Sequence, residues 1–201
     1  HAALLPVYLN GPYAHLQPHT ASVLTIHNLG YPGAFAASEL HVAGLGAEWL
    51  HFERMEFHGH VSFLKGGIVC ADVVTTVSPR YAQEIQTPEF GCGLDGVVQT
   101  RADDIVGLLN GVDNSVWNPA VDPLLPARYS AVNLSGKAVC RTELLKRCGF
   151  ATDFKGPIFG MVARLTEQKG IDLVLANQDF FLAHDVRLVV LGSGDKRMEQ
   201  E

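Results

Sequence analysis

The sequence predicts an α/β protein with parallel sheets. Short apolar runs, rich in β-branched residues, alternate with segments whose apolar residues recur at helical spacing. The expected strands are residues 22–26, 73–77, 105–109, 158–163 and 187–191. The expected helices are residues 4–9, 59–72, 79–86, 136–148 and 171–184. Because strands and helices alternate along the chain, successive strands are expected to run parallel.

Two of the expected helices carry signals at their ends. Ser78 suits the N-cap position and Pro79 the first turn, so together they predict the start of a helix that runs to about residue 86. Ser135 and Gly149 mark the start and the end of the next helix along the chain. Inside an earlier helix, the glycine pair at residues 66–67 indicates close packing against another element.

Residues 34–58 show no clean periodicity. Their large apolar side chains are expected to pack in one local cluster: Trp49, Phe52, Met55 and Phe57. The nearby histidines and glutamates, His51, Glu53, Glu56, His58 and His60, match no spacing typical of zinc ligands. Surface histidines on an irregular segment are therefore expected here rather than a metal site.

The domain organisation follows from one candidate linker. Residues 153–156, Asp-Phe-Lys-Gly, separate a long first region from a second strand-helix-strand unit. The expected division is into two Rossmann-like parallel-sheet units, residues 1–152 and 153–201. The chain opens without an initiator methionine and closes just inside an expected helix. We therefore expect an internal segment of a longer enzyme, with both units incomplete.

Composition excludes several classes of protein. The 201 residues are 47% hydrophobic and 18% charged, which is typical of a soluble globular protein. The net charge of −6 argues against non-specific nucleic-acid binding, which needs a basic face. The longest apolar runs are too short to cross a bilayer. The four cysteines form no C-x-x-C pair and are expected to be reduced intracellular thiols, although a disulfide stays open at this stage.

Arg164 and Lys169 form the first candidate binding site. Both follow the expected strand at 158–163 and precede a helical pattern that begins at Ile171. Open α/β sheets bind ligands at the carboxyl ends of their strands, so this pair lies where an anionic ligand is expected. Spacing alone supports ordinary solvated loop charges equally well.

Two further polar residues follow strands of the first region. His27 comes directly after residues 22–26, where it can donate a hydrogen bond to a ligand or be satisfied by a backbone carbonyl. Asn110 follows residues 105–109, where it can face a ligand or serve a turn. Position alone leaves both pairs of alternatives open.

Gly192 and Gly194 form a G-x-G motif directly after the last expected strand, which suits a phosphate loop. The third glycine of the dinucleotide fingerprint would fall at Arg197, and its absence disfavours an NAD enzyme. A nucleotide-sugar diphosphate fits better beside Arg164 and Lys169.

An ordered series of motifs covers nearly the whole chain: residues 25–29, 63–68, 74–79, 87–91, 93–96, 109–113, 117–119, 163–170 and 191–195. In these stretches the chain closely resembles the bacterial glycogen synthases and plastid starch synthases. These are retaining glucosyltransferases with a GT-B fold that use ADP-glucose. The resemblance implies transfer of glucose from ADP-glucose to the non-reducing end of an α-1,4-glucan, glycogen or starch, with retention of configuration.

The resemblance also implies roles for the candidate residues. Arg164 and Lys169 match the pair that holds the ADP diphosphate and stabilises charge on the leaving phosphate. His27 matches a histidine beside the reacting carbon of the donor glucose, and Asn110 an asparagine that faces the sugar. Residues 192–195, including Gly192 and Gly194, match the nucleotide side of the second domain.

The same resemblance implies what accompanies the reaction. No metal or other cofactor is expected, because the two cations take the place of Mg²⁺, and neither nucleic acid nor membrane is an expected partner. The expected location is the bacterial cytoplasm, or the plastid stroma of a plant or alga. These 201 residues alone are expected to be inactive. Two alternatives stay open: a non-catalytic nucleotide- or glucan-binding fragment, and a related GT-B enzyme that uses UDP-glucose.

Overall fold

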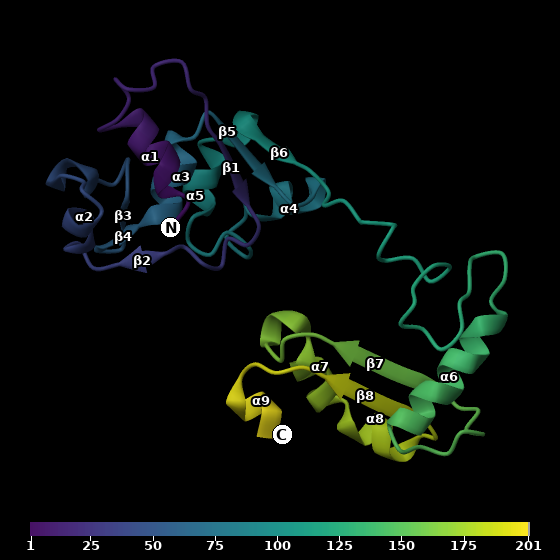
Figure 1. Cartoon of the computed structure of the whole chain (residues 1–201). Helices are drawn as coiled ribbons and strands as arrows, with labels where there is room; N and C mark the ends of the chain where they lie inside the picture. Colours follow the sequence, from purple (N-terminus) through teal and green to yellow (C-terminus); the bar gives the residue numbers. More distant parts are fainter. Residues whose placement is uncertain (201) are drawn as a thin grey trace. The chain divides into compact units, whose positions relative to one another are not determined.

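The computed structural model describes residues 1–200 and divides into two compact units, His1–Gly111 and Val112–Glu201 (Figure 1). Each unit contains a parallel sheet, as the alternation of strands and helices predicts. In residues 1–200, no helix has the length and apolar character needed to cross a membrane.

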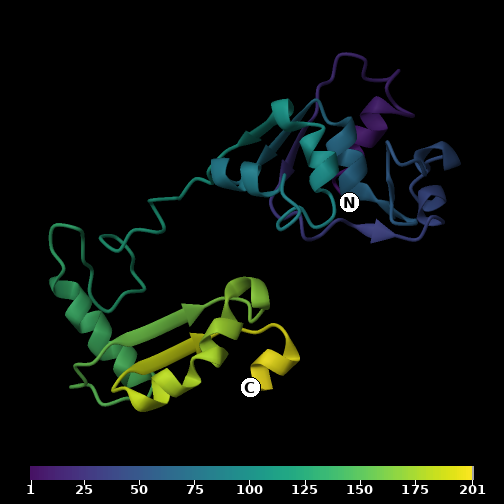
Figure 2. The same cartoon turned by 180° about the vertical axis from the view of Figure 1, so that it is seen from behind.

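The first unit is built on a three-stranded parallel sheet in the order β1-β5-β6. The strands are β1 (Val23–Ile26), β5 (Val73–Thr76) and β6 (Ile105–Gly107). Helices α3 (Phe63–Cys70), α4 (Pro79–Glu84) and α5 (Asp95–Gln99) lie in the connections between them (Figure 2). Nine buried residues form the core between sheet and helices: Leu24, Ile26, Leu29, Ile68, Ala71, Val74, Ile85, Leu94 and Val98. The core therefore includes Leu29, which lies just beyond the end of β1.

A small antiparallel sheet in the order β2-β4-β3 accounts for the segment without periodicity. Its strands are β2 (Ala34–Phe35), β3 (Glu56–Phe57) and β4 (His60–Ser62). The prediction of helix from residue 59 was wrong, because residues 60–62 pair with β2 and β3. The helix begins at Phe63, where the Ser62 hydroxyl accepts the Lys65 N–H at 3.1 Å and serves as N-cap.

A second buried cluster is formed by residues of this small sheet, of α3, and of α1 (Leu4–Asn10), α2 (Glu39–Val42) and η1 (Ala47–Trp49). It consists of Val7, Leu40, Leu45, Trp49, Met55, Val61, Phe63 and Cys70. The predicted apolar cluster is correct for Trp49 and Met55. It is wrong for Phe52, which is 66% exposed, and for Phe57, which packs against the other core cluster. The sequence pattern could not assign these four side chains to separate clusters, because the chain reverses its direction twice between Trp49 and β4.

Close packing around α3 explains its glycine pair. A Cβ on Gly66 would lie 2.7 Å from Met55 Cγ, and one on Gly67 would lie 2.7 Å from the carbonyl oxygen of Ala3. Lys65 of the same helix is buried, and its ammonium donates to the carbonyl oxygens of Phe52 and Glu56. Burial lowers the pKa of Lys65. The predicted role of the glycines in packing is confirmed.

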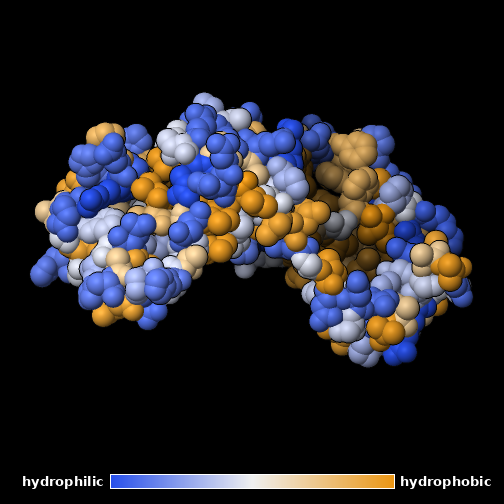
Figure 3. Space-filling view, turned by 90° about the horizontal axis from the view of Figure 1, so that it is seen from above, coloured by the Kyte–Doolittle hydropathy of each residue, from blue (hydrophilic) through white to orange (hydrophobic). Residues whose placement is uncertain are grey.

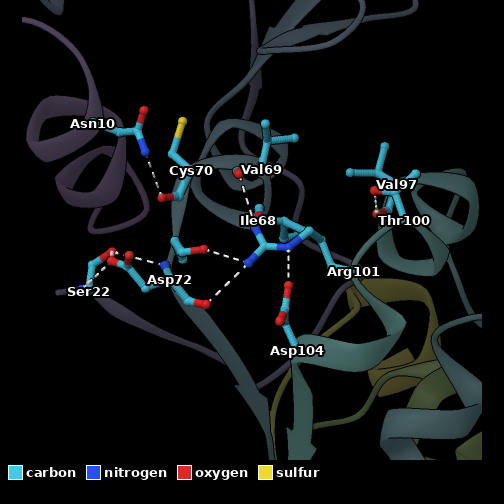
Figure 4. Close-up of polar contacts among 11 residues, drawn as sticks. Asn10, Ser22, Ile68, Val69, Cys70, Asp72, Val97, Thr100, Arg101 and Asp104 are labelled. Atoms are coloured by element: carbon cyan, nitrogen blue, oxygen red, sulfur yellow. Dashed lines mark hydrogen bonds and ion pairs between the residues drawn. The ribbon is translucent and has the colours of Figure 1, made fainter.

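The C-terminal end of α3 is held by Arg101, which lies between α5 and β6 (Figure 4). Its guanidinium donates to the carbonyl oxygens of Ile68, Val69, Ala71 and Asp72 at N···O distances of 2.6, 3.0, 2.7 and 3.3 Å, and Nε donates to Asp104 at 2.9 Å. The last carbonyls of a helix have no partner inside the helix. Arg101 supplies donors to two of them, on Ile68 and Val69, and to the two carbonyls that follow the helix, and it thereby joins α3 to the start of β6.

Asp72, just after the end of α3, fixes the start of β1. The Asp72 carboxylate accepts hydrogen bonds from the Ser22 backbone N–H at 2.7 Å and from its hydroxyl at 3.0 Å (Figure 4). These bonds hold the pKa of the Asp72 carboxyl below its usual value. The β1 and β5 strands are thereby aligned at their first residues, with Val23 opposite Val73.

The second unit contains a two-stranded parallel sheet of β7 (Ile158–Val162) and β8 (Arg187–Leu191), with Ile158 opposite Arg187. Its helical elements are α6 (Ser135–Arg147), η3 (Glu167–Lys169), α7 (Ile171–Ala176), α8 (Gln178–Ala183) and α9 (Lys196–Gln200). The single helix predicted over 171–184 was wrong, because the chain breaks at Asn177. Its side-chain amide donates to the Leu173 carbonyl at 2.7 Å, an alternative to continued backbone bonding.

The start of α6 also differs from its prediction. Ser135 is the first helical residue rather than the N-cap, which is Leu134. The Asn133 side chain accepts the Ser135 N–H at 3.0 Å and thus performs the capping role expected of the serine.

Residues 112–134, which precede α6, expose many large side chains. Those more than half exposed include Val116, Trp117, Leu124 and Val132. Figure 3 shows apolar and polar surface interspersed over the face that it presents. The stretch also contains Pro119, Pro123 and Pro126, and it includes no named helix or strand.

The expected linker at residues 153–156 is packed rather than free. Arg141 of α6 donates to the carbonyl oxygens of Phe154 and Gly156 at 3.0 and 2.6 Å. The Phe154 ring is buried and lies 4.0 Å from the guanidinium carbon of Arg187. The structure divides into compact units after Gly111, whereas the predicted domain boundary lies between residues 152 and 153. The predicted boundary concerns the domains of the full-length protein and stays a prediction.

Candidate active site

The carboxyl ends of β7 and β8 continue into two loops that hydrogen-bond to each other. The Ala163 N–H donates to the Leu191 carbonyl at 3.2 Å, and the Leu165 N–H donates to the Ser193 carbonyl at 3.0 Å. The Asp195 N–H donates back to the Leu165 carbonyl at 2.9 Å. The two loops thus form one paired backbone platform beyond the strands.

Gly192 and Gly194 are the residues that allow this pairing. A Cβ on Gly192 would lie 1.9 Å from the Ala163 carbonyl oxygen, and one on Gly194 would lie 2.3 Å from the Leu165 carbonyl oxygen. Both contacts are with backbone, which cannot swing away as a side chain would. Close approach of the two loops thus explains both glycines, and their predicted role in substrate binding stays a prediction.

Replacing Gly192 by alanine is expected to separate the two loops. The added methyl group cannot fit against the Ala163 carbonyl, so the full-length protein should lose roughly 1–3 kcal/mol of unfolding free energy. Thermal or denaturant unfolding measures this loss. Gly160→Ala is the matched control, because a Cβ there meets no heavy atom within 4 Å. Equal stability of the Gly192 and Gly160 variants would contradict the expectation.

Arg164 and Lys169 lie on the first of the two loops, and both are exposed. Leu165 and Ile171 are buried, at 7% and 4% exposure, and hold the loop between them. Gly170 has a φ of 78°, a left-handed conformation that turns the chain into α7. Across residues 1–200, neither cationic side chain has a hydrogen-bond or ion-pair partner. The first loop therefore presents two exposed cations that form no ion pair in the described residues, the arrangement that the sequence predicts for an anion site.

His27 and Asn110 belong to the first unit. Ile26, Thr76 and Gly107 are register partners at the ends of the three parallel strands, so His27 and Asn110 follow the same edge of the sheet. Both are exposed, and their side chains make no hydrogen bond within the described part of the chain. The alternative that a backbone carbonyl satisfies the His27 ring is therefore wrong, and its ring nitrogens are available to a ligand.

The turn expected at Asn110 is made by another residue. The Asp113 carboxylate accepts the Ser115 hydroxyl at 2.6 Å and the Ser115 backbone N–H at 2.9 Å. These hydrogen bonds lower the pKa of Asp113 from its usual value. The Asn110 amide is left without such a role, so it too can contact a ligand.

Two hydroxyl groups that the sequence analysis did not select hold the backbone around His27. The Thr76 hydroxyl donates to the Ile26 carbonyl at 2.8 Å, and the Tyr81 hydroxyl accepts the Leu29 N–H at 3.0 Å. The available signal was weak: Thr76 is a buried hydroxyl at the end of an apolar strand, and Tyr81 follows the helix cap at Ser78.

Residues 1–200 contain no group of three or more His, Cys, Asp or Glu side chains that could hold a metal ion. The four cysteines are unpaired, with Cys70 buried and Cys92 exposed. The candidate residues selected at the strand ends are two cations, an imidazole and an amide.

Comparison with known proteins supplies the family. Residues 1–100 match the model of the starch synthase catalytic domain. The glycogen synthase of Opitutus terrae is 59% identical over 200 residues, which are 98% of this chain and 42% of that protein. The chain belongs to the glycogen and starch synthase family. The glycogen synthase of Leptothrix cholodnii is 47% identical over 202 residues, 100% of this chain and 42% of the relative.

A solved member of the glycogen and starch synthase family has the same fold. It is the catalytic domain of starch synthase IV from Arabidopsis thaliana bound to ADP and acarbose, with a TM-score of 0.87 and 33% identity. The match covers 97% of this chain and 41% of that one. The predicted GT-B fold is thereby confirmed. The chain spans about two fifths of the length of the curated relatives that it matches.

Proposed function

We propose that the full-length protein is an ADP-glucose-dependent glycogen or starch synthase. It transfers glucose from ADP-glucose to the non-reducing end of an α-1,4-glucan and retains the configuration at the reacting carbon. The observation that carries this proposal is the unpartnered pair Arg164 and Lys169, held on a fixed loop in a chain 59% identical to a glycogen synthase. The Arabidopsis starch synthase bound to ADP and acarbose supports a nucleoside-diphosphate site in this fold.

The chemistry of the reaction explains why two free cations are useful. Cleavage of the glucose–phosphate bond leaves negative charge on the diphosphate and positive character on the sugar ring. Fixed cations lower the free energy of that transition state because they need no reorganisation as charge develops. Arg164 and Lys169 have no carboxylate partner in residues 1–200 from which they must first be separated. They serve as electrostatic stabilisers of the departing ADP.

The other candidate residues contact the donor. His27 donates a hydrogen bond to the donor glucose beside its reacting carbon, and Asn110 binds the same sugar. Gly192 and Gly194 lie on the nucleotide side, where the absence of side chains lets the two loops approach closely. The Gly194 N–H itself donates to the Glu199 carboxylate at 2.6 Å. This assignment agrees with the exposed and unpartnered side chains of His27 and Asn110.

The reaction is proposed to need no metal and no other cofactor, since the two cations neutralise the diphosphate as Mg²⁺ does elsewhere. The partners are ADP-glucose and the glucan, without nucleic acid or membrane. The proposed location is the bacterial cytoplasm, or the plastid stroma if the source is a plant or alga. The bacterial origin of the relatives supports the first location.

Incorporation of labelled glucose into glycogen tests the function. The full-length protein is expected to elongate glycogen from ADP-glucose, to do so faster than from UDP-glucose, and to keep its rate when a chelator is added. The 201-residue chain alone is the control and is expected to incorporate no label above a heat-inactivated sample, because it spans about two fifths of its relatives.

Each outcome distinguishes one proposal from its alternatives. No incorporation by the full-length protein, with ADP binding retained, would support a non-catalytic nucleotide-binding role. A higher rate with UDP-glucose would overturn the donor assignment, and loss of activity with the chelator would overturn the metal-free mechanism. Turnover by the short chain would contradict the expectation that it is inactive.

A further inference from the structure

We propose that Tyr81 is a positioning residue for His27 and that its hydroxyl, together with that of Thr76, holds the His27 turn in its productive geometry. The inference rests on the proposed role of His27 toward the donor sugar. It adds two residues that lie 50 and 52 positions from their hydrogen-bond partners along the chain.

The backbone is anchored on both sides of His27. Before it, the carbonyl oxygen of Ile26 accepts the Thr76 hydroxyl at 2.8 Å. After it, the N–H of Leu29 donates to the Tyr81 hydroxyl at 3.0 Å. The side chains of Ile26 and Leu29 are buried, at 2% and 0% exposure. His27 therefore projects from a short turn whose two ends are fixed in the core.

The turn itself has local support. The Asn28 side-chain oxygen accepts the Gly30 N–H at 2.9 Å, which closes the loop after the histidine. The His27 ring remains exposed and has no partner in residues 1–200. A fixed backbone with a free ring is the arrangement expected of a side chain that must meet a ligand in one geometry.

Tyr81 is itself firmly held, so its hydroxyl is a fixed point. The Ser78 hydroxyl accepts the Tyr81 N–H at 2.9 Å at the start of α4. The Tyr81 ring packs against the core cluster that contains Leu29. The start of α4 also lies close on β6, where a Cβ on Gly107 would be 2.4 Å from the Ser78 carbonyl oxygen. The position of α4 therefore fixes the Tyr81 hydroxyl, and this hydroxyl in turn fixes the backbone of the His27 turn at Leu29.

Removing the Tyr81 hydroxyl should leave the N–H of Leu29 buried and unpaired while the ring still fills its place. Such a group regains a partner only if the turn shifts, and that shift moves His27. Because His27 contacts the reacting sugar, misplacement should lower kcat. Affinity for ADP should be unchanged, since the ADP diphosphate is assigned to Arg164 and Lys169.

The first test is Tyr81→Phe in the full-length protein. Glucose transfer from ADP-glucose should fall about three- to tenfold in kcat, the change expected for loss of one hydrogen bond. The dissociation constant for ADP should stay within a factor of two or so of wild type. The matched control is Tyr8→Phe, which also removes a tyrosine hydroxyl bonded to backbone, here donating to the Ala43 carbonyl at 2.7 Å. Tyr8 packs against the other core cluster, so its variant should keep wild-type kcat.

The second test is a double-mutant cycle with His27→Ala. If Tyr81 acts through His27, Tyr81→Phe should cause no further loss of kcat in the His27→Ala background. The same three- to tenfold loss in both backgrounds would overturn the proposal, because Tyr81 would then act independently of the histidine. If Tyr81→Phe does not fold, Thr76→Val removes the other hydroxyl at nearly constant volume and enters the same cycle.

The cycle also separates this inference from the proposed function. If His27→Ala lowers kcat but neither Tyr81→Phe nor Thr76→Val does, positioning by these hydroxyls is wrong and the role of His27 stands. If His27→Ala turns over like wild type, the role of His27 is wrong, and the positioning proposal fails with it.

Discussion

Replacing Arg164 or Lys169 by alanine is expected to lower kcat of the full-length protein by roughly two to three orders of magnitude, the range for losing one electrostatic stabiliser of a transition state. Each side chain is exposed and, in residues 1–200, engaged with no protein group. Their removal therefore breaks no hydrogen bond or ion pair among the described residues, and the unfolding free energy should change by no more than about 0.5 kcal/mol. A large kinetic effect with a small effect on stability is the signature of a residue that acts on substrate.

Steady-state glucose transfer, ADP binding and thermal unfolding together test this expectation. The controls are Arg128→Ala and Lys155→Ala, which remove exposed cations of the same unit that lie outside the two paired loops and make no side-chain hydrogen bond or ion pair with residues 1–200. Both controls should turn over like wild type. Arg164→Lys keeps the charge but loses the planar fork, so it should be intermediate. Near-wild-type turnover in both Arg164→Ala and Lys169→Ala would refute the assigned role.

The parallel strands were predictable because each is a short run of mainly apolar or β-branched residues between helical patterns. The strands β1, β5, β7 and β8 match their predicted ranges to within one residue at each end. The small antiparallel sheet was not predictable, since strands of two or three residues are too short to show alternation. The break at Asn177 had a local cause, a side-chain hydrogen bond to the previous turn, that apolar spacing does not report.

The position of the candidate site residues was predictable for a simpler reason. A polar residue soon after a strand of a parallel sheet lies at the edge where such sheets bind ligands, and Arg164, His27 and Asn110 all follow strands in this way. Their roles toward a ligand stay predictions. What the sequence could not show is how they are held. Tyr81 lies in a helix and Thr76 in a neighbouring strand, so their bonds around His27 arise only when the sheet forms. Gly192 similarly fitted a phosphate loop, whereas the structure shows a backbone contact that requires it.

Arg101→Ala is expected to lower the unfolding free energy by about 3 kcal/mol, the largest effect on stability that we predict for one side chain. The Arg101 side chain is only 16% exposed and donates to four backbone carbonyls as well as to Asp104 (Figure 4). Its removal takes the side-chain donors from carbonyls at the end of α3, whose Ile68 is fully buried in the core. Arg101→Lys should recover little, because an ammonium has three donors where the guanidinium has five in a fixed fork.

Denaturant or thermal unfolding of the full-length protein measures the effect. Arg80→Ala is the matched control, since Arg80 bonds Glu84 at 2.8 Å across one helical turn but its side chain is 78% exposed. A surface pair of this kind stabilises a protein by about 0.5 kcal/mol or less, so the control should unfold close to wild type. If Arg101→Ala and Arg80→Ala have the same unfolding free energy, water must satisfy the carbonyls at the end of α3 as well as Arg101 does. Arg101 would then be a surface residue rather than the link that holds α3 to β6.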